Sequence, residues 1–165
     1  MHKSLKNKII SRIYGHGRGW AFSANDFLED FKRSEIDNAL SDLRQENTIR
    51  RVCRGIYDYP VFSNLLKTIA APDINSVAAA FARKFRWQVY PTGDTALNYF
   101  GFSTQMPGRN IYLSDGPSRK FDLEGGRLEF KHSAQREIVF KYPESALVVQ
   151  AIRALGGERV NREIV

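Results

Sequence analysis

The sequence is poor in the residues that build disulfide and metal sites. Cysteine occurs once, at Cys53, and histidine occurs three times in 165 residues. A single cysteine excludes an internal disulfide framework and a cysteine-based zinc site. The histidines, His2, His16 and His132, are not spaced as metal ligands are. The sequence therefore predicts no metal site and no cofactor.

Long apolar runs are also missing. No stretch reaches the roughly 18 apolar residues that a membrane span needs, and the basic N-terminus has no apolar signal-peptide segment. We therefore expect a cytoplasmic protein with no membrane partner. The 42% hydrophobic content is that of a folded globular protein, and no internal repeat or low-complexity segment interrupts it.

Cationic residues outnumber anionic ones. Lysine and arginine total 25 against 18 aspartates and glutamates, a formal net charge of +7. Such an excess favours a polyanionic partner, above all nucleic acid. The basic residues cluster in two places, over residues 44–54 and at Arg83, Lys84 and Arg86.

The first 60 residues show a readable order of elements. Helical spacing of apolar residues predicts a first helix over residues 5–13, and a short apolar run at 20–22 predicts a strand. Ser23 is a suitable N-cap for a second helix over 24–31. Ser34 is expected to cap a third helix, whose buried stripe consists of Ile36, Ala39, Leu40 and Leu43.

An extended pattern follows the third helix. Residues 48–53 and 56–59 flank Arg54-Gly55, which predicts a β-hairpin that ends at Pro60. Three short helices followed by a hairpin are typical of a winged helix-turn-helix. In that fold the third helix enters the major groove of DNA and the hairpin, or wing, lies along the phosphates.

The remaining residues predict a second domain with mixed helices and strands. Asp73 is a plausible N-cap for an amphipathic helix that reaches Phe85. Strands are expected over 87–90 and 110–113, a hairpin around Gly125-Gly126, and a helix over 144–155. The predicted class is α+β: an N-terminal winged helix-turn-helix (residues 1–60) followed by a small α/β domain (61–165). The last residues are compatible either with a truncated chain or with a ragged end.

Two regions of the predicted winged helix could contact DNA. The hairpin arginines suit phosphate contacts, and the N-terminal part of the third helix suits base readout. The predicted DNA-binding residues are Arg33, Ser34, Asn38, Ser41, Arg44, Arg50, Arg51 and Arg54. Three carboxylates on or near the same helix, Glu35, Asp37 and Asp42, would repel phosphate. They favour the alternative of a winged-helix module that binds another protein.

A catalytic alternative stays open. Asp115, Glu129 and Lys131 form an acid followed by an E-x-K triplet, the pattern of restriction-endonuclease-like nucleases that use Mg²⁺. However, E-x-K is a common triplet, and an aspartate in an SDGP turn is expected for turn geometry alone. Cys53 is either a reactive thiol beside Arg51 and Arg54 or a half-buried core residue. We predict no catalytic residues and no enzymatic activity.

Three stretches, taken in order, resemble the AbiEi-type antitoxins of type IV toxin–antitoxin systems. Residues 36–60 read IDNALSDLRQENTIRRVCRGIYDYP and are similar to the family's third helix and RGxY-bearing wing. Residues 91–107 read PTGDTALNYFGFSTQMP, and residues 111–119 read IYLSDGPSR. With the spacing between them they cover most of the chain.

The resemblance implies a function beyond what the residues themselves predict. It implies a winged helix that binds operator DNA and represses its own toxin–antitoxin operon. It also implies a C-terminal domain that opposes a nucleotidyltransferase-like toxin, without necessarily forming a stable complex with it. A stand-alone transcriptional regulator is equally compatible with these motifs.

Overall fold

The chain has the mixed α+β character that the sequence predicts. The computed structural model describes residues 2–99, 101, 108–133 and 143–155. The expected ragged end of the chain lies outside the described residues. Contacts divide the chain into two compact units, which we call the first unit (residues 1–86 with 123–125) and the second unit (87–122 with 126–165).

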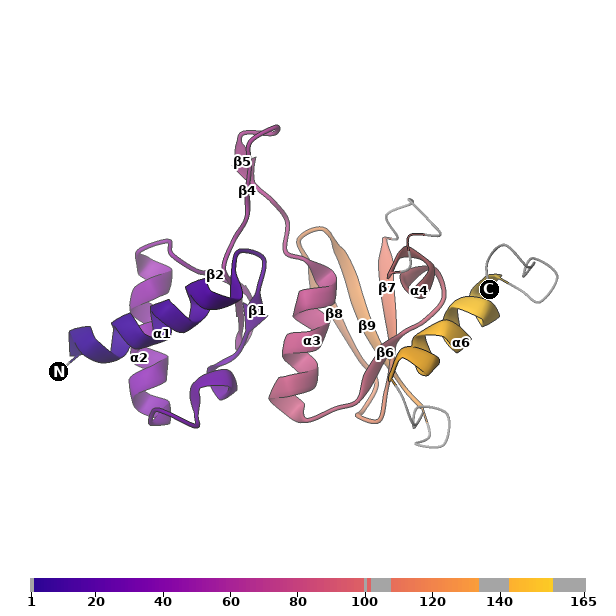
Figure 1. The fold of residues 1–165 in the computed structure, drawn as a ribbon, viewed down its shortest axis with the longest axis horizontal. Helices are drawn as coiled ribbons and strands as arrows, with labels where there is room; N and C mark the ends of the chain where they lie inside the picture. Colours follow the sequence, from indigo (N-terminus) through magenta and orange to yellow (C-terminus); the bar gives the residue numbers. More distant parts are fainter. Residues whose placement is uncertain (1, 100, 102–107, 134–142, 156–165) are drawn as a thin grey trace. The chain divides into compact units, whose positions relative to one another are not determined.

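The first unit begins with helices and a small antiparallel sheet (Figure 1). Its strands pair in the order β1-β3-β2, so β3 is central and β2 is an edge. The elements are α1 (His2–His16), β1 (Ala21–Phe22), the 3₁₀ turn η1 (Ala24–Phe27), α2 (Arg33–Gln45), β2 (Arg50–Cys53) and β3 (Ile56–Asp58).

Two local expectations for this region were wrong. The helix expected over 24–31 is only the 3₁₀ turn η1, although Ser23 is its N-cap as predicted and forms a capping box with Asp26. Ser34 does not cap α2, because the helix begins at Arg33 with Lys32 at the N-cap position, which places Ser34 in the first turn. The side chain of Glu35 instead accepts a hydrogen bond from the backbone N–H of Lys32, at 3.2 Å. The Ser34 side chain is exposed.

The core of the first unit forms where the apolar faces of α1 and α2 meet η1 and β1. The predicted stripe of α2 is buried as a whole, and it packs with Ile9 and Ile13 of α1 and with Phe22 and Phe27. The rings of Phe22 and Phe27 meet edge to face, with centroids 5.7 Å apart. This arrangement leaves the opposite side of α2 free to face solvent.

Helix α3 (Ile74–Phe85) belongs to the first unit. As predicted, Asp73 caps it by accepting hydrogen bonds from two backbone N–H groups. Ser76 Oγ accepts a hydrogen bond from Ala21 N, and Arg83 donates to Ala21 O, both at 2.7 Å. The helix thus covers the outer edge of β1, which would otherwise offer unpaired backbone groups. The unit therefore extends to Arg86, beyond the predicted boundary at residue 60.

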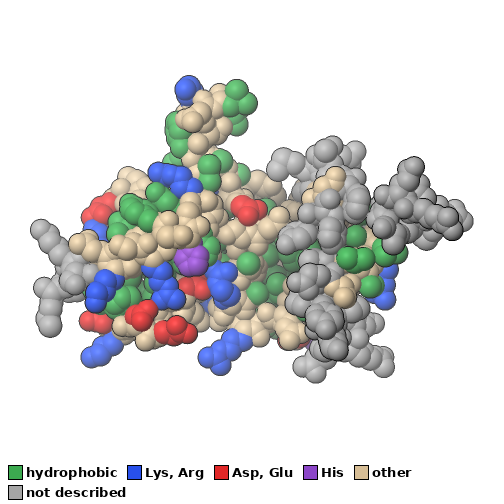
Figure 2. Space-filling view, in the orientation of Figure 1, with side chains coloured by type: hydrophobic (Ala, Val, Ile, Leu, Met, Phe, Trp, Pro, Cys, Tyr) green, Lys and Arg blue, Asp and Glu red, His purple; other side chains and the backbone are tan. Residues whose placement is uncertain are grey.

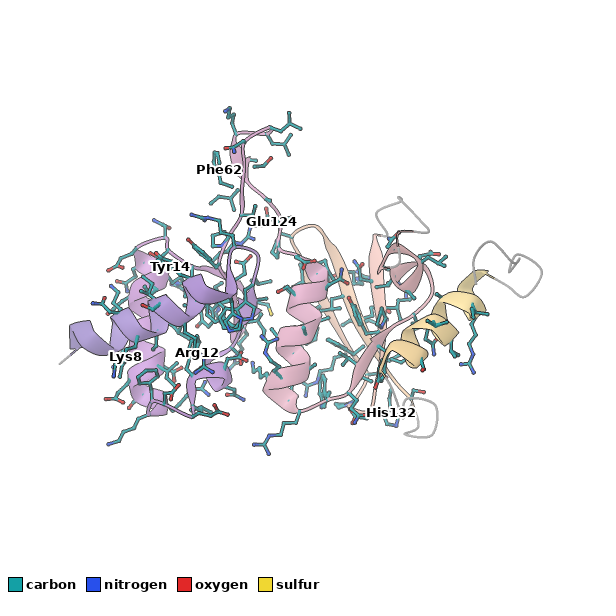
Figure 3. The ribbon with its side chains drawn as sticks, in the orientation of Figure 1. Lys8, Arg12, Tyr14, Phe62, Glu124 and His132 are labelled. Atoms are coloured by element: carbon teal, nitrogen blue, oxygen red, sulfur yellow. The ribbon has the colours of Figure 1, made fainter. Side chains whose placement is uncertain are left out.

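A second hairpin, which the sequence did not predict, connects β3 to α3. Its strands are β4 (Phe62–Ser63) and β5 (Thr68–Ile69), and we call residues 61–70 the arm. Leu65 and Leu66 at its tip are 90% and 71% exposed, and Figure 2 shows hydrophobic side chains along it. A hollow of about 290 Å³ at its base is lined in part by Tyr14 and Phe62 (Figure 3).

The second unit is a four-stranded mixed sheet with helices α4 and α6. The strands follow the order β6-β7-β9-β8, with β6 antiparallel and β9 parallel to β7. Among the described residues, no helix combines the length and the hydropathy of a membrane span. The elements are β6 (Val89–Pro91), α4 (Asp94–Tyr99), β7 (Arg109–Ser114), β8 (Arg119–Leu123), β9 (Gly126–His132) and α6 (Pro143–Leu155).

Replacing leucines of the arm and replacing a leucine of the core should have very different effects on the free energy of unfolding. We expect the double substitution Leu65→Ser and Leu66→Ser to change the free energy of unfolding by less than about 0.5 kcal/mol per site, because both side chains are exposed. Leu40→Ala, at a site that is 1% exposed, should cost about 2–5 kcal/mol. Urea denaturation measures both. A large loss of stability in the arm variant would show that the arm packs against the protein.

Candidate nucleic-acid interface

The outward face of α2 is polar and uncharged along its centre. Helical geometry aligns Ser34, Asn38, Ser41 and Gln45 in one row, opposite the buried stripe. All four side chains are exposed. Amide and hydroxyl groups can donate to and accept from base edges, and an asparagine can bind adenine through two hydrogen bonds. We call this set the polar row.

Cations flank the polar row on one side. Arg33 and Arg44 are exposed, and Arg44 makes no ion pair among the described residues. Arg33 Nε bonds both carboxylate oxygens of Asp37, at 2.9 and 3.0 Å. An exposed pair four residues apart on a helix contributes only about 0.3–0.5 kcal/mol. A phosphate can therefore compete with Asp37 for the guanidinium of Arg33.

Two of the three carboxylates that argued against DNA binding have other partners. Glu35 closes the N-terminus of α2, and Asp37 is neutralised by Arg33. Of the three, Asp42 alone is exposed without a cation partner among the described residues, and helical spacing places it on the opposite flank from Arg33 and Arg44. The repulsion that a phosphate would meet on this helix is therefore smaller than the sequence suggested.

Arg50 has a structural role that its neighbours in the hairpin lack. Its guanidinium forms a two-pronged ion pair with Asp58 on β3, with Nη2–Oδ2 at 2.6 Å and Nε–Oδ1 at 3.1 Å. A third bond runs from Nη1 to the carbonyl of Ala70, at 2.9 Å. The hydrogen bonds to Asp58 raise the pKa of Arg50. We therefore remove Arg50 from the predicted set of DNA-contacting residues.

Arg51 and Arg54 are the exposed arginines of the hairpin. Gly55 follows Arg54 with φ at 76°, the left-handed conformation that a tight turn requires. The ammonium group of Lys84 lies 3.5 and 3.4 Å from the carbonyls of Arg54 and Gly55, so α3 supports the turn from behind. The hairpin therefore presents two exposed cations beside a turn that Lys84 supports.

Cys53 lies in the same hairpin and is half-buried. Burial raises the pKa of its thiol, although the positive charges of Lys84 and Arg51 partly oppose that effect. The structure thus supports a half-buried core cysteine rather than a reactive thiolate.

Sequence reasoning omitted three exposed residues near these elements. Gln45 completes the polar row, Lys32 precedes α2, and Arg86 ends α3 in a left-handed conformation, with φ at 58°. Gln45 could have been found by extending the row by one further helical turn. Arg86 belongs to the second basic cluster of the sequence, but it was not included because its helix was assigned to the other domain.

Two of the three residues of the nuclease alternative, Asp115 and Glu129, make structural contacts in the second unit. Asp115 accepts a hydrogen bond from Gln88 N at 2.9 Å, which fixes the turn after β7. Glu129 is 1% exposed and bonded to Arg109 at 2.8 Å. No group of three potential metal ligands occurs among the residues that the structure describes.

Comparison with known proteins assigns the chain to a family. Residues 8–164 match DUF6088, a family of unknown function, so the chain belongs to that family. No curated protein and no solved structure matches the chain significantly. The match links the chain to no antitoxin, and the resemblance to AbiEi-type antitoxins stays a prediction.

The free energy of unfolding of two variants tests whether Arg50 has a structural role that Arg51 lacks. We expect Arg50→Ala to lower the free energy of unfolding by about 3–5 kcal/mol, because the carboxylate of Asp58 would stay buried without its partner. Arg51→Ala, one residue away and exposed, should change it by less than about 0.5 kcal/mol. Urea denaturation at neutral pH gives both values, and equal losses would contradict the assignment.

Proposed function

We propose that this protein is a transcriptional regulator that binds double-stranded operator DNA through its first unit and has no enzymatic activity. In this proposal α1, η1, α2 and the β2–β3 hairpin act as a winged helix-turn-helix. Helix α2 enters the major groove, and the hairpin lies along the phosphate backbone. The polar row reads base edges, while Arg33, Arg44, Arg51 and Arg54 contact phosphates.

The observation that carries the proposal is the exposed face of α2. Its centre is a row of uncharged hydrogen-bonding side chains, and its flank carries two exposed arginines. A protein-binding face would instead be expected to show aromatic or apolar anchors at its centre. This difference favours DNA over the alternative of a protein-interaction module.

The resemblance to AbiEi-type antitoxins supports a more specific form of the proposal. The operator would then belong to the protein's own toxin–antitoxin operon, and the second unit would oppose a nucleotidyltransferase-like toxin in the cytoplasm. This form rests on the three similar stretches, and none of the contacts described above depends on it. DNA binding and toxin opposition therefore need separate tests.

The salt dependence of binding tests the hairpin. We expect Arg51→Ala with Arg54→Ala to reduce the slope of log K against log salt by about 2 units, because each phosphate contact contributes about 0.9. The loss should be similar for all duplexes, since phosphates carry no sequence information. Fluorescence anisotropy with labelled duplexes at several salt concentrations measures both quantities.

Two further variants make this test selective. Arg127→Ala with Arg153→Ala removes the same charge from exposed sites of the second unit and should leave the slope nearly unchanged. Asn38→Ala should weaken preferred sites by about 1–3 kcal/mol without altering the slope. If both double variants lower the slope equally, the hairpin makes no specific phosphate contact.

Toxin opposition is tested by co-expression with a nucleotidyltransferase-like toxin encoded beside the gene. We expect the Arg51→Ala and Arg54→Ala variant to lose operator repression yet still protect cells, because these residues lie in the first unit and opposition is assigned to the second. Growth and a promoter–reporter assay at matched protein levels give the two readouts. Loss of protection together with repression would show that the two activities are not separable.

A further inference from the structure

The second unit contains a basic cavity that the proposed DNA interface does not use. The cavity has a volume of about 470 Å³ and is lined by the start of β7, the start of β8 and the middle of β9. These segments are close together because β9 lies between β7 and β8 in the sheet. The lining residues are Arg109, Ser118, Arg119, Lys120, Glu129, Phe130 and Lys131.

Strand geometry explains why charged residues meet here. Side chains alternate along β9, so Glu129 and Lys131 lie on one face of the sheet and Phe130 on the other. The ring of Phe130 packs on that other face with Tyr112, at a centroid distance of 6.0 Å. Ser118 accepts a hydrogen bond from the backbone N–H of His132, labelled in Figure 3, which ties the approach to β8 against β9.

Glu129 is the unusual member of the cavity. Its side chain is 2% exposed, and its Oε2 accepts a hydrogen bond from Arg109 at 2.8 Å. This bond lowers the pKa of Glu129, against the opposing effect of burial, so the group is charged at neutral pH. Its other oxygen, Oε1, is buried and has no hydrogen-bond partner among the described residues. A buried acceptor left unpaired is costly, and a bound donor would remove that cost.

The other residues that line the cavity favour a negatively charged ligand. Arg109 is neutralised by Glu129, which leaves Lys120 and Lys131 as an excess of positive charge around the opening. Lys120 and Lys131 are exposed and form no ion pair among the described residues. The matching ligand therefore combines an anionic group for the cations with an uncharged N–H or O–H donor for Oε1 of Glu129.

We propose that this cavity binds a small phosphate monoester that carries a hydroxyl or amino group, a nucleoside 5′-phosphate or a sugar phosphate. The phosphate lies against Lys120 and Lys131, and the donor reaches Oε1 of Glu129. The cavity lies within the range of about 300–1,000 Å³ that is typical of small-molecule sites and is larger than a phosphate ion needs. This site does not depend on the proposed DNA binding.

Isothermal titration calorimetry of the full-length protein, without DNA, tests the proposal. The probes are AMP, GMP, CMP, UMP, glucose 6-phosphate and inorganic phosphate. We expect a monoester to bind at least tenfold more tightly than inorganic phosphate, because its separate hydroxyl or amino group donates to Glu129 while its phosphate contacts the lysines. Preference among the probes distinguishes a nucleotide from a sugar phosphate. No binding by any probe at millimolar concentration would overturn the proposal.

Variants separate the two halves of the site. Lys120→Ala with Lys131→Ala should weaken the monoester roughly tenfold per lysine. Glu129→Gln should bring the monoester's affinity to within about threefold of that for inorganic phosphate. Arg127→Ala removes a cation from the same strand but outside the cavity, and should leave binding unchanged. Circular dichroism confirms the fold of each variant.

Two results would contradict the proposal. If the lysine variant binds as tightly as the wild type, phosphate does not lie in this cavity. If Arg127→Ala weakens binding as much as the lysine variant does, the attraction is a general effect of positive charge. The lysines are exposed, so their replacement tests the site even where Glu129→Gln fails to fold.

Discussion

One guanidinium connects the parts of the first unit that the proposed interface requires. Arg50 lies directly opposite Asp58 in the hairpin register and bonds its buried carboxylate through two nitrogens. A further bond reaches the carbonyl of Ala70, where the arm returns toward α3. The hairpin, the arm base and the segment leading into α3 are thus tied to a single side chain. Removal of that side chain would leave a buried charge unpaired, which is among the most damaging changes a small domain can suffer.

The parts of the fold that could be predicted from the sequence are those that local patterns determine. The buried stripe of α2, the Arg54-Gly55 turn and the Asp73 cap are local patterns, and each appears where the sequence placed it. The arm has no glycine or proline at its turn, so it gave no hairpin signal. The placement of α3 depends on Ser76 and Arg83 reaching Ala21, a contact between distant residues that local patterns do not encode.

In the candidate site, too, local sequence patterns do not show which single residues are held by contacts with other elements. Arg50, Arg51 and Arg54 look equivalent in sequence, yet only Arg50 is held by an ion pair. Counting outward from the turn would set Arg51 opposite Asp58. The register shifts between Arg51 and Cys53, so that Arg50 lies opposite Asp58 and Arg51 opposite Tyr57. Likewise, the roles of Glu35 and Asp37 depend on where α2 begins, which the misplaced cap at Ser34 obscured.

Partner choice in both units depends on which charges are already paired. In the first unit, Asp58, Asp37 and Asp26 each hold an arginine, while Arg44 and Arg54 remain exposed without an ion pair among the described residues. In the second unit Glu129 holds Arg109 and leaves Lys120 and Lys131 unpaired within the described part of the chain. Because these carboxylates are already paired, the positive charge at each of the two surfaces is more concentrated than the net charge of +7 suggests. This concentration favours the binding of an anion.

The position of α3 also changes how the two proposed activities would be divided along the chain. A fragment that ends at residue 60 would lose the partners of both backbone groups of Ala21, the ammonium group behind the hairpin turn and the carbonyl that Arg50 binds. Each is a contact to the sheet or hairpin of the proposed DNA-binding unit. The last of these partners is Lys84, and the main segment of the first unit ends at Arg86. The proposed DNA-binding activity therefore corresponds to residues 1–86 rather than to the first 60.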